Sequence, residues 1–184
     1  EIGGAIWIGI AGLDIALWDI KGKSLNKPIY ELLGGKKRDK MPIYASSMKR
    51  DLTPLDEAKR AAKFVEQGFK GYKMHSAVPG KIDDPSDQTI DTVTEVRKAV
   101  GDNIDILVDV NGAYSVHHAI EVGKKLQDLG VFHFEEPRPH YDLEGLSKVA
   151  DALDIPIASG ENIYSEFEYK ALSLIHISEP TRPL

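Results

Sequence analysis

The chain has 184 residues and a formal net charge of −6, from 23 lysines and arginines against 29 aspartates and glutamates. This acidic balance, without a basic block, argues against nucleic acid or an anionic membrane surface as a partner. Cysteine is absent, which excludes disulfides, thiolate metal sites and cysteine nucleophiles. The hydrophobic share of 42% is ordinary for a globular chain, and no apolar run approaches the ~18 residues of a membrane span. We therefore expect a cytoplasmic protein with one sizeable core.

Both ends of the sequence are unusual. It begins at Glu1 without an initiator methionine or a signal-peptide pattern, so we expect an internal piece of a longer protein. From Leu172 the sequence LSLIHISEPTRPL resembles the translation of a sequencing-library adaptor. We expect residues 172–184 to be a non-native tail and leave them out of the functional reasoning; the alternative is a native strand followed by a linker.

The predicted elements follow from hydrophobic spacing and from breaking residues. Apolar residues at steps of three or four predict a helix over 6–20, and a short helix is expected over 29–33, before Gly34 and Gly35. From Met41 onward strands and helices alternate. The expected strands are 41–47, 70–75, 104–110, 131–136 and 156–161. The expected helices are 55–68, with Thr53 as N-cap and Pro54 at its first position, 86–100, 115–129, 142–153, and one that begins near Ser165.

Five βα units in a row predict parallel strands joined by helical crossovers. Either a (β/α) barrel or an open doubly wound sheet fits this order. No GxGxxG follows the first strand and no GxxxxGK[ST] occurs, which disfavours the nucleotide-binding open sheets. A full barrel takes about 250 residues. We therefore predict a truncated TIM-type barrel of about five of eight units in residues 41–171, preceded in residues 1–40 by helices that join it to a missing capping domain.

Three acids recur at equal intervals of 26 residues: Asp109, Glu135 and Glu161. Each is expected at the carboxyl end of a strand, so the spacing predicts three carboxylates at one height on the catalytic face of a barrel. Alternation along the strand predicts that Glu135 points inward and Glu136 does not. Three converging carboxylates require a cation, and an all-oxygen set favours Mg²⁺ over Mn²⁺ or Ca²⁺. The alternative is that these acids merely cap the following helices.

One unit earlier, Lys73 and His75 are two residues apart and share one face of their strand. Beside a bound divalent cation both side chains tend toward neutrality, which is the state that a general base needs. We therefore expect Lys73 and His75 to be catalytic. The alternatives are a surface lysine and a strand-end histidine that is hydrogen-bonded to a neighbour.

The motifs GLDIALWDIKGK, PIYELLGG, Lys-x-His, LVDVNG, FEEP and SGEN occur in this order. In order and spacing they resemble the enolase superfamily, and within it the mandelate racemase/muconate-lactonizing subgroup, over essentially all of residues 1–171. The resemblance implies that Asp109, Glu135 and Glu161 are Mg²⁺ ligands and that Lys73 lies beside the substrate carboxylate. It places His75 where many members carry a second lysine as base.

The resemblance implies further features of the site and of the protein. Ser46 matches a position that contacts substrate in some members, and Asn111 and Asn162, which follow metal-ligand positions, are further substrate-binding candidates. A His–Asp pair and a further acid are expected on later strands, which this chain lacks, so we expect the fragment to be inactive by itself. The full-length protein is expected to be a homo-oligomer.

The implied chemistry is abstraction of the proton α to a carboxylate, through an enediolate that Mg²⁺ stabilises; this pairing of a lysine or histidine base with Mg²⁺ is the family's known one. We predict a sugar-acid dehydratase with a small-molecule carboxylate, a sugar acid, as substrate. A racemase or epimerase of the same superfamily is the alternative within the class. Outside it, a non-catalytic metal-binding remnant and a phosphate-binding barrel such as an aldolase stay open.

Overall fold

The computed structural model describes residues 4–174, and these divide into two compact units between Pro42 and Ile43. The first unit contains α1 (Gly4–Leu25) and the short α2 (Ile29–Leu32). The backbone N–H of Lys27 donates to the carbonyl of Gly22 at 2.9 Å, which closes the end of α1. Although α1 has 22 residues, no helix among those described is both long and apolar enough to cross a bilayer.

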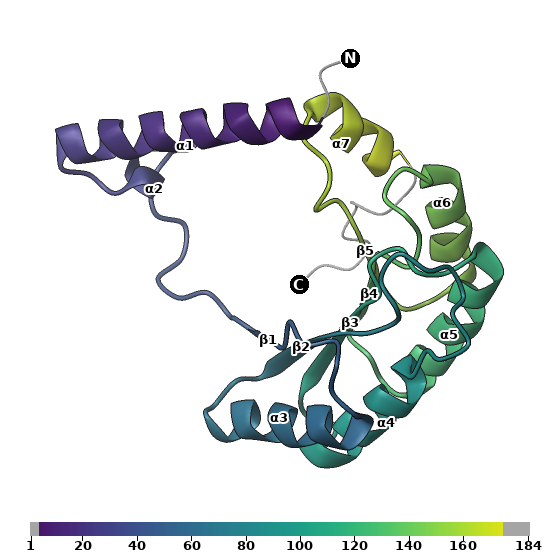
Figure 1. Cartoon of the computed structure of the whole chain (residues 1–184). Coiled ribbons are helices and arrows are strands. Elements are labelled where there is room, and N and C mark those ends of the chain that lie inside the picture. Colours follow the sequence, from purple (N-terminus) through teal and green to yellow (C-terminus); the bar gives the residue numbers. More distant parts are fainter. Residues whose placement is uncertain (1–3, 175–184) are drawn as a thin grey trace. The chain divides into compact units, whose positions relative to one another are not determined.

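The second unit alternates strands and helices around one sheet (Figure 1). The strands are β1 (Ala45–Ser46), β2 (Gly71–His75), β3 (Asp105–Asp109), β4 (His133–Glu135) and β5 (Ile157–Ala158). The helices are α3 (Pro54–Glu66), α4 (Thr89–Val100), α5 (Val116–Asp128), α6 (Leu143–Ala152) and α7 (Glu166–Ser173).

All strand pairs are parallel and the strand order is β1-β2-β3-β4-β5. Each crossover therefore advances by one strand in the same direction, as in a (β/α) barrel, whereas a doubly wound sheet reverses its order at a switch point. The predicted barrel-type α/β architecture is confirmed, and the alternative of an open doubly wound sheet is wrong.

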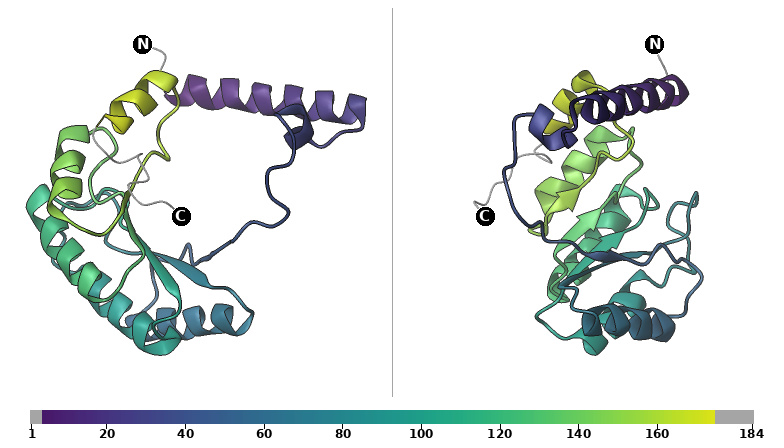
Figure 2. Two further views of the ribbon diagram at one scale, coloured as in Figure 1. Left: turned by 180° about the vertical axis from the view of Figure 1, so that it is seen from behind. Right: turned by 90° about the vertical axis from the view of Figure 1, so that its left-hand side faces the viewer.

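Helices α3 to α6 lie along one face of the sheet, as the left view of Figure 2 shows. The side chains of Tyr72, Met74, Ile106, Val108 and Phe134 are buried in the core with apolar residues of these helices. Because side chains alternate along a strand, the residues between them face the opposite side of the sheet. This alternation separates the helix-facing core from the side chains of the site.

Local capping explains where α3 and α5 begin. Thr53 accepts a hydrogen bond from the N–H of Asp56 at 3.2 Å, and Pro54 occupies the first position of α3, both as predicted. Ser115 caps α5 in the same way through the N–H of His118 at 3.2 Å.

The strands are shorter than the apolar pattern predicts, most clearly at β1, because pairing with β2 includes only Ala45 and Ser46. At the other end, α7 continues through Ser173, past the predicted start of the tail at residue 172, and Leu172 is buried. The rest of the predicted tail, residues 175–184, lies outside the described residues.

Candidate active site

The strand register sets the candidate site residues in two rows. Asp109 on β3 pairs with His75 on β2 and with Glu135 on β4. One step earlier, Leu107 pairs with Lys73 on one side and with His133 on the other. Both rows face away from the helix layer.

Glu161 lies near Asp109 and Glu135 although it is not on a strand. Its predicted height on the sheet is wrong, since the residue opposite Glu135 on β5 is Ala158 and Glu161 lies three residues further on, in a turn. Equal spacing along the sequence did not correspond to equal register here, because the connection after β4 is shorter than the one after β3. Nevertheless, Asp109, Glu135 and Glu161 each offer one oxygen such that all three oxygens lie within 4.8 Å of one another.

Lys73 connects two of these carboxylates. Its ammonium lies 2.6 Å from Oε2 of Glu135 and 2.9 Å from Oδ2 of Asp109, and its side chain is only 10% exposed. Burial lowers the pKa of Lys73, but the hydrogen bonds to Glu135 and Asp109 outweigh burial and raise it. Lys73 is thus held in its charged form here, and its expected neutrality beside a bound cation stays a prediction.

The side chain of His75 is buried beside Asp109 and comes from the same strand as Lys73. Its Nε2 lies 3.3 Å from Oδ2 of Asp109, and its Nδ1 finds no hydrogen-bond partner among the described residues. Burial lowers the pKa of His75, and together with the positive charges of Arg50 and Lys73 it outweighs the carboxylate of Asp109, which raises the pKa. The imidazole is therefore favoured in its neutral form.

Glu135 stays ionised although it is largely buried. Burial disfavours its charge, but the contacts with His133 and Lys73 outweigh burial and lower its pKa to about 2. His133, which lies 3.4 Å from Oε2 of Glu135, was missed by the sequence reasoning. The signal was present, because His133 is two residues before Glu135 and so shares its face of the strand.

The prediction that Glu136 points away from the site is wrong. Glu136 is 4% exposed, and Asn162 Nδ2 lies 3.4 Å from its Oε1. Burial raises its pKa to about 7, and the charges of Glu161 and Asp109 add to this effect. Strand alternation fails at this residue because its φ of 45° is left-handed and β4 has already ended at Glu135.

The three candidate substrate-binding residues are placed as follows. Ser46 is exposed and pairs with Lys73 in the sheet. Asn111 accepts a hydrogen bond from Arg50, and Asn162 contacts Glu136. Asn111 and Asn162 line one cavity of about 410 Å³ together with Glu136 and Glu161.

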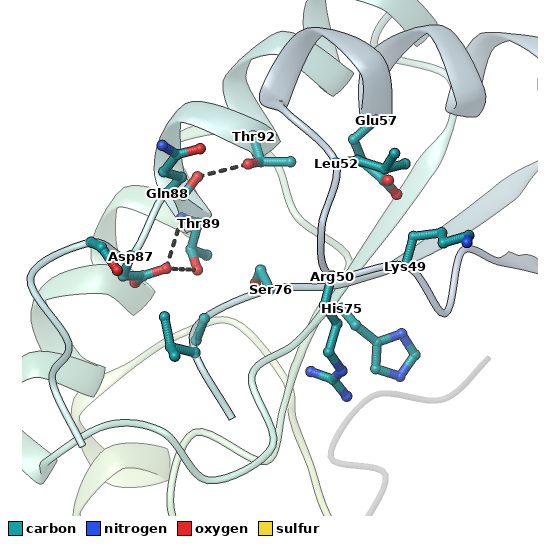
Figure 3. Close-up of a pocket in the computed structure, with 13 residues that line it drawn as sticks. Lys49, Arg50, Leu52, Glu57, His75, Ser76, Asp87, Gln88, Thr89 and Thr92 are labelled. Carbon is teal, nitrogen blue, oxygen red and sulfur yellow. Dashed lines mark hydrogen bonds between the residues drawn. The ribbon is translucent and has the colours of Figure 1, made fainter. Parts of the chain in front are cut away.

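A second cavity, of about 110 Å³, borders His75. Figure 3 shows Arg50 beside His75 in its wall, with Asp87 and Thr89 further along. Arg50 was also missed by the sequence reasoning, because only the fold brings it within reach of Asn111, 61 residues later in the chain. The site is thus bordered by two cavities, one at the carboxylates and one at the imidazole.

The donor set fits a hard divalent cation. The three candidate ligands supply only carboxylate oxygens, and the carboxylate of Glu136 is buried close to them, in the lining of the cavity that contains Glu161. The single positive charge of Lys73 pairs with Asp109 and Glu135, so the cluster of three carboxylates keeps a net negative charge.

Comparison with known families identifies the class. The family described as "Enolase C-terminal domain-like" matches residues 56–174, and the N-terminal domain of the mandelate racemase/muconate lactonizing enzyme family matches residues 3–34. The chain belongs to the enolase superfamily, in its mandelate racemase/muconate-lactonizing subgroup.

Individual relatives are similar over most of the chain. The arabinonate dehydratase of Saccharolobus solfataricus is 39% identical over 165 residues, which are 88% of this chain and 42% of the relative. The L-talarate/galactarate dehydratase of Salmonella typhimurium is 37% identical over 175 residues, 95% of this chain and 42% of the relative. The chain thus spans less than half the length of these relatives.

A solved structure agrees with the fold. A mandelate racemase/muconate lactonizing protein from Paracoccus denitrificans, complexed with magnesium, is 36% identical with a TM-score of 0.81. The similarity covers 89% of this chain and 44% of that protein.

Proposed function

We propose that this chain carries the metal-binding and base-bearing part of a Mg²⁺-dependent enzyme that abstracts the proton α to a carboxylate, and that the enzyme is a sugar-acid dehydratase. One observation carries the proposal: oxygens of Asp109, Glu135 and Glu161 converge within 4.8 Å beside Lys73 and His75. The enolase-superfamily membership supports it.

Mg²⁺ is the proposed ion, with Mn²⁺ as a substitute, because both are hard cations that carboxylates bind. The similar Paracoccus protein is complexed with magnesium. When bound, Mg²⁺ would act as a Lewis acid toward the substrate carboxylate and stabilise the negative charge that develops as the α-proton leaves. Asp109, Glu135 and Glu161 would hold it.

The chain's own residues would bind the substrate and move the proton. A neutral imidazole can accept a proton, and the ring of His75 is buried next to the candidate ligands. Lys73 donates hydrogen bonds from a charged ammonium in the same row, so we assign it to holding the substrate carboxylate. We assign Ser46, Asn111 and Asn162 to contacts with the substrate, supported for the two asparagines by the cavity that they share with Glu161.

The choice of dehydration over racemisation comes from the relatives. Two that cover most of this chain are dehydratases of arabinonate and of L-talarate/galactarate. Both reactions begin with the same proton abstraction, so the observed site supports either one. A sugar acid is the proposed substrate class.

The proposal extends to the protein as a whole. We assign residues 1–40 to a junction with a capping domain and residues 41–171 to the barrel, and the match of residues 3–34 to the family's N-terminal domain supports the first assignment. Homo-oligomerisation, implied by the resemblance, and a cytoplasmic location, expected from the composition, stay predictions.

Titration calorimetry of the 184-residue chain with Mg²⁺ tests the metal site. We expect binding that Glu135→Gln abolishes and that Glu144→Gln leaves intact, since Glu144 is an exposed residue of α6 that pairs with Lys148. In the presence of Mg²⁺, arabinonate should bind and arabinose, which lacks the carboxylate, should not. Equal Mg²⁺ affinity in the parent chain and Glu135→Gln would reject the proposed function.

A further inference from the structure

The row of residues directly before the candidate ligands contains two nitrogen-bearing side chains. Lys73 on β2 and His133 on β4 both pair with Leu107 on β3, which lies between them. Both are two residues before a residue of the next row, Lys73 before His75 and His133 before Glu135. They therefore share the face of the sheet that carries the carboxylates.

These two side chains converge on a single oxygen. Oε2 of Glu135 lies 2.6 Å from Nζ of Lys73 and 3.4 Å from Nε2 of His133. The histidine side chain is 18% exposed and that of Glu135 is 15% exposed, so water has little access to the contact. Oε2 is thus contacted from two strands, while neither contact involves Oε1.

A hydrogen bond to Glu135 would give Nε2 of His133 the partner that it lacks among the described residues. Its Nε2 is buried and makes no well-formed hydrogen bond within the part of the chain that the structure describes, although the carboxylate lies at 3.4 Å. Burying a polar nitrogen without a hydrogen-bond partner is destabilising. A small rotation of the carboxylate toward the imidazole would complete an N–H···O bond.

We propose that His133 is a positioning residue that orients the carboxylate of Glu135 for metal binding. The terminal torsion of a glutamate is broad, so a metal-ligating carboxylate needs a neighbour to set its plane. Lys73 has a flexible four-carbon stem, whereas His133 has a rigid ring attached to the same strand as Glu135. With Oε2 held by His133, Oε1 is presented to the cation. This inference rests on the proposed function.

The test measures Mg²⁺ affinity by calorimetry, and Mn²⁺ affinity by electron paramagnetic resonance, on the full chain. His133→Leu removes the donor and keeps apolar volume. His133→Gln places an amide N–H near the position of Nε2, and His133→Asn places it nearer Nδ1. His117→Leu is the matched control, because Nε2 of His117 lies 3.5 Å from a carboxylate oxygen of Glu121 but is on the exposed surface of α5.

We expect His133→Leu and His133→Asn to weaken metal binding by about 10- to 100-fold, the usual effect of losing a partner of a metal ligand. His133→Gln should restore affinity to within a few fold of the parent chain, and His117→Leu should change nothing. Circular dichroism and thermal unfolding with chelator present establish that each variant is folded. If His133→Leu does not fold, the comparison of His133→Gln with His133→Asn decides.

Parental Mg²⁺ affinity in His133→Leu, or equally weak binding in His133→Gln and His133→Asn, would overturn the positioning role. If His133→Leu keeps parental affinity while Glu135→Gln abolishes binding in the same series, the proposed function stands and the inference about His133 is rejected. If the parent chain binds neither ion at millimolar concentration, the proposed function and this inference are both rejected.

Discussion

The ammonium of Lys73 on β2 lies 2.6 Å from Oε2 of Glu135 on β4, across the intervening strand β3. Parallel pairing in register makes this possible, because it places inward side chains of β2, β3 and β4 at matching heights. One ammonium thus contacts the carboxylates of both Glu135 and Asp109. The arrangement makes the stability of the fold depend on charges that the site also uses.

Lys73→Met should destabilise the chain by about 3 kcal/mol in the presence of a chelator, because it leaves buried carboxylates uncompensated. Mg²⁺ should restore more stability to this variant than it adds to the parent chain, since the ion no longer competes with the ammonium. Urea unfolding with and without Mg²⁺ measures both effects. Lys59→Met, which removes an exposed pair with Asp56, is the control. An equal loss in both variants would contradict the prediction.

Ionisation of Glu136 should lower the free energy of unfolding as pH rises, in the presence of a chelator. Burial and the charges of Glu161 and Asp109 raise its pKa from 4.5 to about 7 in the folded state. The folded state therefore binds the proton more tightly, and this stabilisation is complete below pH 4.5 and lost as pH rises to about 7. The loss amounts to about 2 kcal/mol, discounted for partial solvent screening.

Glu136→Gln removes the titrating group and keeps its shape. The difference in unfolding free energy between the parent chain and this variant should change between pH 4.5 and pH 7, and Glu144→Gln should show no such change. Urea unfolding across this range measures it. Parallel pH profiles for the parent chain and Glu136→Gln would show that Glu136 does not titrate there.

Among the basic residues near the surface, Arg97 on α4 should be the one whose substitution lowers the unfolding free energy most. Its guanidinium donates to four backbone carbonyls, at 3.1 Å to Leu129 and at 2.8 Å to Gly101, Ile104 and Gly130. Lysine cannot reproduce this planar set of donors. Arg97→Lys should therefore cost about 2 kcal/mol of unfolding free energy, since carbonyls lose their partners.

The neighbouring Lys98 is the control for Arg97, because it forms an exposed ion pair with Glu95. Thermal and urea unfolding should show little change for Lys98→Met. A loss for Arg97→Lys that does not exceed that of Lys98→Met would contradict the assignment.

Asp142 should stabilise α6 through both its shape and its charge. Its carboxylate accepts the N–H of Gly145 at 2.9 Å and pairs with Arg138, and these contacts lower its pKa. The stabilisation is therefore present above the ordinary pKa of 3.8 and is lost as pH falls below it. At pH 7, Asp142→Ala should cost about 1 kcal/mol.

Asp142→Asn separates the two contributions, because an amide oxygen still accepts the N–H of Gly145 but carries no charge for Arg138. Its loss of unfolding free energy at pH 7 should be smaller than that of Asp142→Ala. The difference between parent and Asp142→Asn should shrink toward pH 3 in urea unfolding. A difference independent of pH would rule out the charge contribution.

The sequence by itself determined the α/β class, the order of strands and helices, and the three acids that converge. Thr53 with Pro54 defines a helix start locally, and the alternation around Asp109 defines its face of β3, because both depend on neighbours in the chain. The order and spacing of the six motifs, three of which contain these acids, were sufficient to identify the superfamily.

Only the tertiary structure decided how strands pair and where the chain leaves the sheet. The register of β4 with β5 places Ala158, not Glu161, opposite Glu135, and the left-handed backbone at Glu136 turns that carboxylate toward the other acids. The contacts of Arg50 with Asn111 and of Lys73 with Glu135 join segments that are distant in the chain. Periodicity in one segment reports the local conformation, whereas these distances depend on the packing of all the segments together.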